Sequence, residues 1–85
     1  MYAYLSVKNL SGYPIITVMV NNRLFLPDLI SRSEYKPCPA GSIQVTVFNN
    51  RARLIKDLYL PLNSYCRYIL EIYPDRYNLI HSGYS

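Results

Sequence analysis

The sequence is poor in charged residues, glycine and the side chains that most often carry out catalysis. Only 16% of its 85 residues are charged, against about 25% in typical soluble domains. It has three glycines, one histidine and no tryptophan. Three glycines cannot supply a glycine-rich phosphate loop. No run of about 20 apolar residues occurs, so we expect no membrane-spanning segment.

The potential catalytic groups are isolated from one another along the chain. The five acids are Asp28, Glu34, Asp57, Glu71 and Asp75. The two cysteines and His81 would give at most three zinc ligands, far apart and without the usual spacing. We therefore expect a binding or assembly module with no enzyme activity, no metal and no cofactor.

Tyrosine is the residue present in excess, with ten copies, and the chain is 51% hydrophobic with a net charge of +4. Many tyrosines and few charges give an amphipathic surface suited to contacts with other surfaces. The basic residues are scattered, and only Arg51, Arg53 and Lys56 lie close together. Because no stripe of basic residues accompanies the aromatic ones, we do not expect nucleic acid as a partner.

Period-two alternation of apolar and polar residues, interrupted by Gly, Pro and Asn, predicts short strands throughout the chain. Asn21-Asn22 predicts a tight hairpin turn, and 37–41 (PCPAG) a rigid turn. The predicted strands are 2–8, 15–20, 23–26, 30–36, 42–48, 53–60, 65–73 and 77–81. This spacing indicates one all-β domain over residues 1–85, a seven- to eight-stranded antiparallel sandwich of transthyretin-like or immunoglobulin-like type, with its strand order left open.

A series of features between Tyr4 and Ile72 resembles one bacterial family. In order, they are an early strand (5–9, LSVKN), a strand ending in a Val-Asn turn (16–22, ITVMVNN), Tyr35 before Pro-Ala-Gly (39–41), a Val-x-Val strand (45–47), and a Leu-turn-Tyr pair (62–68). In these features the chain resembles the bacterial domain of unknown function 4397. The resemblance implies a β-sandwich of an exported module and no particular activity.

The two cysteines, Cys38 and Cys66, leave three alternatives open. They are two buried free thiols, an internal disulfide, or disulfides between neighbouring subunits. An internal bond would close a loop of roughly 28 residues. By reducing the entropy of the unfolded chain, it would stabilise a small domain by about 3.5 kcal/mol.

The tyrosines divide by the face of their strand. Tyr68 alternates in register with Leu70 and Ile72, so we expect it in the core with its hydroxyl bonded to a nearby turn. Four others share faces with polar residues, and we predict that they form an interface or, alternatively, a second small core cluster under a loop. These are Tyr2, Tyr4, Tyr65 and Tyr73.

These observations predict a structural protein that self-assembles into a filament or layer of a bacterial surface or spore envelope, with itself as partner. Its strand edges and tyrosine-rich surface would make the contacts, and the first strand would pair with a neighbour's sheet edge. The start of the chain has no signal-peptide pattern. We therefore expect synthesis in the cytoplasm and deposition on the cell or spore surface.

The alternative function is a monomeric adhesion or carbohydrate-binding module. Its partner would be a cell-surface glycan or another envelope protein. Exposed tyrosines would stack on the ligand, and a loop formed by Phe48, Asn49, Asn50 and Arg51 would supply polar groups.

Overall fold

Eight strands and their turns account for the chain in the computed structural model, which describes residues 1–84. Among these residues, no helix has the length and hydropathy needed to cross a bilayer. The strands are β1 Tyr2–Asn9, β2 Ile16–Val20, β3 Arg23–Leu29, β4 Lys36–Pro39, β5 Gly41–Asn49, β6 Leu54–Leu62, β7 Cys66–Ile72 and β8 Tyr77–Tyr84.

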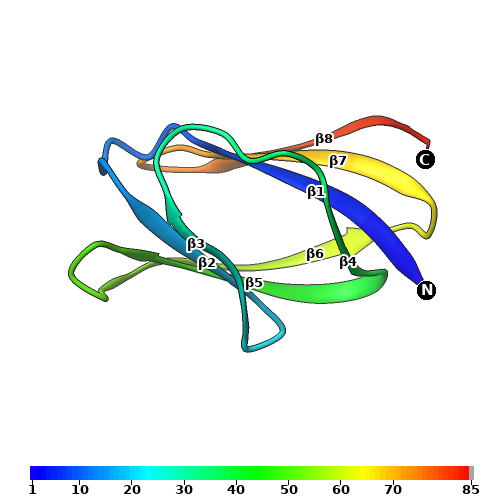
Figure 1. The fold of residues 1–85 in the computed structure, drawn as a ribbon, viewed down its shortest axis with the longest axis horizontal. Coiled ribbons are helices and arrows are strands. Elements are labelled where there is room, and N and C mark those ends of the chain that lie inside the picture. The colour runs from blue at the N-terminus through cyan, green and yellow to red at the C-terminus, as the bar shows by residue number, and fades with distance from the viewer. Residues whose placement is uncertain (85) are drawn as a thin grey trace.

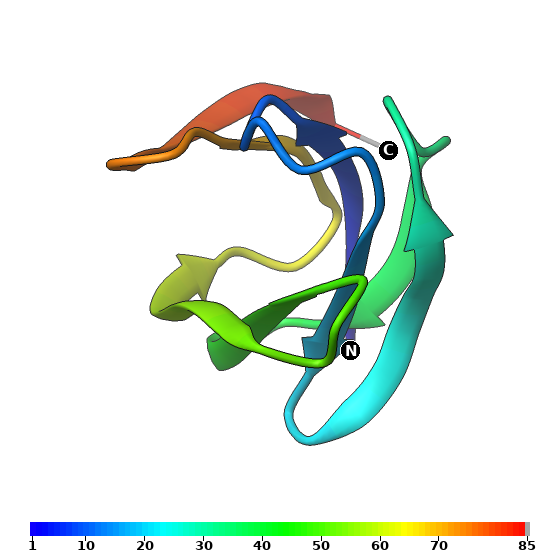
Figure 2. The same ribbon diagram turned by 90° about the vertical axis from the view of Figure 1, so that its left-hand side faces the viewer.

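The strands form two facing four-stranded sheets, in the orders β4-β1-β7-β8 and β3-β2-β5-β6 (Figures 1 and 2). The pair β1–β7 is parallel and the other strand pairs are antiparallel. The predicted all-β sandwich is confirmed. An immunoglobulin constant domain places strands A, B, E and D in one sheet, and neither sheet here has that order. The order therefore favours the transthyretin-like alternative.

The core lies between the two sheets and follows the predicted alternation. In β5, Ile43, Val45 and Val47 point inward and are at most 1% exposed. In β1, the inward residues Ala3, Leu5 and Val7 are completely buried. Each fully buried Val, Leu or Ile side chain contributes roughly 1.5–3 kcal/mol relative to exposure. Burial of this two-sided apolar layer therefore fixes the register of the central strands.

The segment 30–41 differs from the sequence prediction. Residues 30–35 form an irregular strap with one isolated bridge between Lys8 and Arg32, where a strand was expected. The expected rigid turn is instead the edge strand β4, which pairs with β1. Ala40 donates its backbone N–H to the Met1 carbonyl at 3.2 Å. The backbone N–H and C=O groups of the even-numbered residues of this strand therefore point toward β1. The backbone nitrogens of Pro37 and Pro39 then point away from β1, where no N–H is needed for the ladder.

Proline was also expected to end the third strand, and here too the prediction was wrong. β3 continues past Pro27 to Leu29, because it is an edge strand and its ladder with β2 shifts register. Asp28 absorbs the irregularity with a φ of 50°. The predicted Asn21-Asn22 hairpin is confirmed, with φ values of 50° and 62°.

The predicted role of the first strand in pairing with a neighbour was wrong for this fold. β1 lies between β4 and β7, so its backbone hydrogen-bonding groups are occupied on both sides. A free edge for association must therefore be sought elsewhere in the two sheets.

Candidate functional site

Two of the four predicted interface tyrosines meet at one corner of the sandwich. Tyr2 and Tyr65 are 60% and 62% exposed, and the Tyr65 backbone N–H donates to the Tyr2 carbonyl at 2.9 Å. Tyr65 adopts a φ of 62° in the turn before β7. Tyr4 lies two residues further along β1 and is half-buried. The corner therefore joins the start of β1 to the start of β7.

Tyr73 does not belong to that corner. It follows the last residue of β7, so about 26 Å of extended chain separates it from Tyr65. Its hydroxyl donates to Glu71 Oε1 at 3.2 Å, and the Arg76 guanidinium lies 4.2 Å from its ring centroid. These local contacts hold Tyr73 at the β7–β8 turn.

Tyr84 is a corner residue that the sequence analysis missed. It is 77% exposed and pairs with Cys66 across the β7–β8 ladder, next to Tyr65. The prediction ended the last strand at residue 81, because Gly83 resembles a tail. We call Tyr2, Tyr65 and Tyr84 the aromatic corner; the start of β1 and the end of β8 lie at this end of the sandwich (Figure 1).

Three of the four sheet edges contain proline, and β4 and β3 are two of them. The outward side of β4 carries Pro37 and Pro39, neither of which has an N–H to donate. β3 contains Pro27 and the irregularity at Asp28. Proline and bulges at an edge prevent another strand from adding to the sheet.

The edge strands β6 and β8 differ in both proline and charge. β6 carries Lys56, Asp57 and Pro61. β8 contains no proline and no Asp, Glu, Lys or Arg. Five of its residues, from Tyr77 to His81, pair with β7 in an uninterrupted antiparallel register, and the ladder shifts register before Gly83. β8 is therefore the edge strand of the described residues that has no proline and no formally charged side chain, and its one irregularity lies beyond His81.

Cys38 and Cys66 are free and buried, at 1% and 5% exposure. They flank the same stretch of β1: Cys38 pairs with Ala3 on one side, and Arg67, next to Cys66, pairs with Tyr4 on the other. Two strand spacings, about 9–10 Å, exceed the roughly 7 Å that a disulfide spans between Cα atoms. Burial raises the pKa of the Cys38 thiol to about 11. Both thiols are therefore buried and free in this chain, and the internal disulfide is excluded; disulfides between neighbouring subunits stay a prediction.

Tyr68 lies where the sequence predicted. It is 5% exposed, and its hydroxyl accepts the backbone N–H of Asn63 at 2.9 Å. His81 packs on it with ring centroids 5.4 Å apart. Tyr68 therefore joins the core to the β6–β7 turn.

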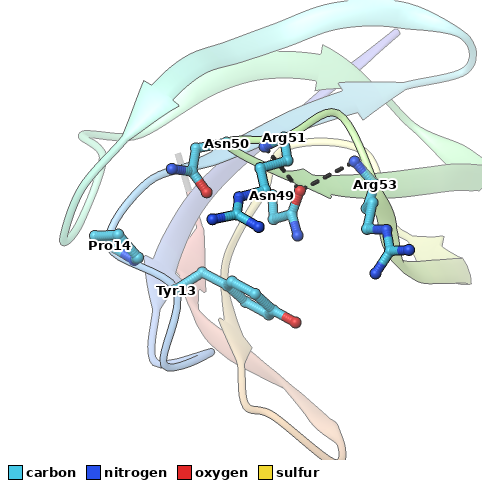
Figure 3. A pocket seen from close by; sticks show the side chains of 6 residues that line it. All are labelled: Tyr13, Pro14, Asn49, Asn50, Arg51 and Arg53. Atoms are coloured by element: carbon cyan, nitrogen blue, oxygen red, sulfur yellow. Dashed lines mark hydrogen bonds between the residues drawn. The ribbon is translucent and has the colours of Figure 1, made fainter.

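The predicted polar loop lies at the opposite end of the sandwich from the aromatic corner. Asn49 ends β5 and organises the turn, because its Oδ1 accepts the backbone N–H groups of Arg51 at 2.9 Å and Arg53 at 3.0 Å. Figure 3 shows these two bonds and the two arginine side chains on either side of the amide. Phe48 is half-buried and does not line the pocket beside this turn.

No protein-family model matches the chain, and no curated protein matches it either. The resemblance to the domain of unknown function 4397 therefore stays a prediction, and functional assignment depends on the surfaces described above.

Proposed function

We propose that this protein is a self-associating structural subunit of a bacterial surface or spore envelope, and that two copies pair edge to edge through β8. One observation carries the proposal: β8 is the edge strand without proline or a formally charged side chain. An unpaired, uncharged edge is a template for another strand.

The geometry of β8 suits such a pairing. The Tyr73 backbone N–H donates to the Arg76 carbonyl at the turn. Because antiparallel residues alternate between facing the partner strand and facing away, Tyr77 and Leu79 present their backbone groups outward. Two β8 strands related by a twofold axis would join two four-stranded sheets into one of eight strands.

A twofold contact closes after two copies, so a filament or layer needs a second contact. The aromatic corner supplies a candidate, because it presents three exposed tyrosines. Large rigid rings with a polar tip favour interfaces. In this proposal, β8 makes the dimer and the corner links dimers.

The proposal is tested by measuring mass with light scattering across a concentration series. We expect the wild-type protein to reach at least twice the chain mass of 9.9 kDa. Ile80→Lys places two like charges on one face of the paired strands and should shift the midpoint of association at least tenfold upward in concentration. Tyr77→Pro removes an outward N–H and should act in the same direction.

The matched control is Tyr59→Lys, which adds the same charge at a residue 68% exposed on β6. It should leave the mass unchanged. A wild-type monomer at millimolar concentration would overturn the proposal and leave the alternative of a monomeric adhesion or carbohydrate-binding module. Equal effects of Tyr59→Lys and Ile80→Lys would show that β8 is not the contact.

A further inference from the structure

A polar pocket of about 410 Å³ opens at the end of the sandwich away from the aromatic corner. It lies between the β1–β2 loop and the β5–β6 turn (Figure 3). We call it the loop-end pocket, and no acidic residue lines it. Its lining residues are Tyr13, Pro14, Asn49, Asn50, Arg51 and Arg53. This volume is within the range of small-molecule sites.

Two asparagines at strand ends hold the pocket in shape. Asn49 fixes the turn that carries Arg51 and Arg53, through the two bonds to its Oδ1. On the other side, Asn9 Nδ2 donates to the Tyr13 carbonyl at 3.0 Å. It also donates to the Ile30 carbonyl at 3.0 Å, and so ties two loops together. A site held by such bonds loses little conformational freedom when a ligand binds.

The pocket contains donors that have no acceptor among residues 1–84. Asn49 is only 6% exposed as a residue, and its Nδ2 makes no hydrogen bond with the described residues. Because no fully buried side-chain polar atom among these residues lacks a partner, this Nδ2 is accessible at the surface. In Figure 3 this nitrogen points into the space above the Tyr13 ring. The one ion pair within residues 1–84 joins Arg76 to Asp75, so the guanidinium groups of Arg51 and Arg53 are both free to bind an anion.

We propose that the loop-end pocket binds a saccharide unit that carries a carboxylate, such as a uronic acid within an acidic glycan. The guanidinium of Arg51 or Arg53 matches a carboxylate with two parallel N–H donors. The Asn49 and Asn50 amides suit neighbouring sugar hydroxyls, which both donate and accept. The Tyr13 ring, with its residue 42% exposed, offers an apolar face for the C–H side of the sugar.

Other anionic ligands fit the pocket less well. Single-stranded nucleic acid is held by several aromatic residues along a basic groove, and the pocket has one aromatic ring. A peptide would require an apolar recess for its side chains, whereas amides and guanidinium groups form most of these walls. The inference does not depend on the association through β8, because the pocket and that edge are separate surfaces.

The experiment is titration calorimetry of the wild-type protein with tri-galacturonate and with the neutral galactose trisaccharide. We expect the acidic probe to bind at least tenfold more tightly than the neutral one. Asn49→Asp keeps the acceptor of the turn but replaces the free donor by a negative charge. It should weaken binding of the acidic probe at least tenfold. Arg51→Gln and Arg53→Gln should each weaken it severalfold.

The matched control is Arg23→Gln, which removes one positive charge at the β2–β3 hairpin, outside the pocket. It should bind the acidic probe as the wild type does, and urea midpoints confirm that each variant folds. The proposal would be overturned if the neutral probe bound as tightly as the acidic one. It would also be overturned if Arg23→Gln weakened binding of the acidic probe as much as the pocket variants do. Tighter binding of inorganic phosphate or of a single-stranded oligonucleotide than of tri-galacturonate would overturn it in favour of a phosphate ligand.

Discussion

The Asn49 side chain should determine both the stability of the β5–β6 turn and the chemistry of the loop-end pocket, and two substitutions separate these roles. Asn49→Ala removes the acceptor of two backbone N–H groups, those of Arg51 and Arg53. Asn49→Asp keeps an oxygen in the same place. Only the second variant should retain the two bonds from the side chain to the turn.

The expected magnitude follows from the two hydrogen bonds. Each contributes about 0.5–1.5 kcal/mol net, so Asn49→Ala should lower the unfolding free energy by about 1–3 kcal/mol. In a domain of this size, each kcal/mol corresponds to about 4–8 °C in Tm. For Asn49→Asp we expect a change below about 1 kcal/mol, because the carboxylate accepts the same N–H groups beside two arginines.

Urea denaturation at pH 7 measures both changes as shifts in midpoint at constant slope. Asn50→Ala is the matched control, because Asn50 is exposed and makes no side-chain hydrogen bond with the described residues. It should change stability by no more than about 0.5 kcal/mol. Equal destabilisation by Asn49→Asp and Asn49→Ala would contradict this role of the Asn49 Oδ1. A cost of Asn49→Ala no larger than that of Asn50→Ala would contradict it as well.

Three further outcomes are expected from the buried groups. Tyr68→Phe should lower the free energy of unfolding by about 1–2 kcal/mol in urea denaturation, because the Asn63 N–H loses its acceptor. The control Tyr59→Phe, at a residue 68% exposed, should cost nothing measurable. Equal costs of the two substitutions would contradict this role for the Tyr68 hydroxyl. Cys38 and Cys66 should react with a thiol reagent at pH 7 only after unfolding, and fast reaction of the native protein would contradict their burial. Because the pKa of Cys38 is raised in the folded protein, its thiol stays neutral there at a pH at which the thiol of the unfolded chain ionises. Ionisation then favours the unfolded state, so the free energy of unfolding should fall as the pH rises from 9.0 to about 11. Cys38→Ala should remove that part of the decline, whereas identical pH dependence in both proteins would argue against it.

The sequence predicted the strands best where both the alternation and the turn chemistry were strong. β5 and β7 were placed to within one residue at each end, and the Asn21-Asn22 turn was correct. The predictions failed at the prolines of β3 and β4. Proline does not fit in a central strand, but it fits in an edge strand where its nitrogen points away from the neighbouring strand. A local sequence pattern does not show whether a strand lies at an edge.

The candidate sites were predictable only in part. Residues Asn49 to Arg51 were singled out as a polar loop, and they do line a pocket. Tyr13 was missed, because it comes from the β1–β2 loop, 36 positions earlier in the chain than Asn49. The four predicted interface tyrosines share polar strand faces, but strand alternation does not tell which end of the sandwich a residue occupies.

Alternation and turn chemistry by themselves determined the class of this protein, because side-chain burial in a strand repeats every two residues and Asn, Gly and Pro restrict the backbone locally. The tertiary structure alone decided which strands are central and which are edges. It separated Cys38 from Cys66 by the width of β1, placed the proline-free and uncharged strand β8 at an edge, and brought Tyr13 to the arginines of the β5–β6 turn. These outcomes depend on pairings between strands that are distant in sequence. Burial of the whole apolar layer selects these pairings, and no single segment determines them.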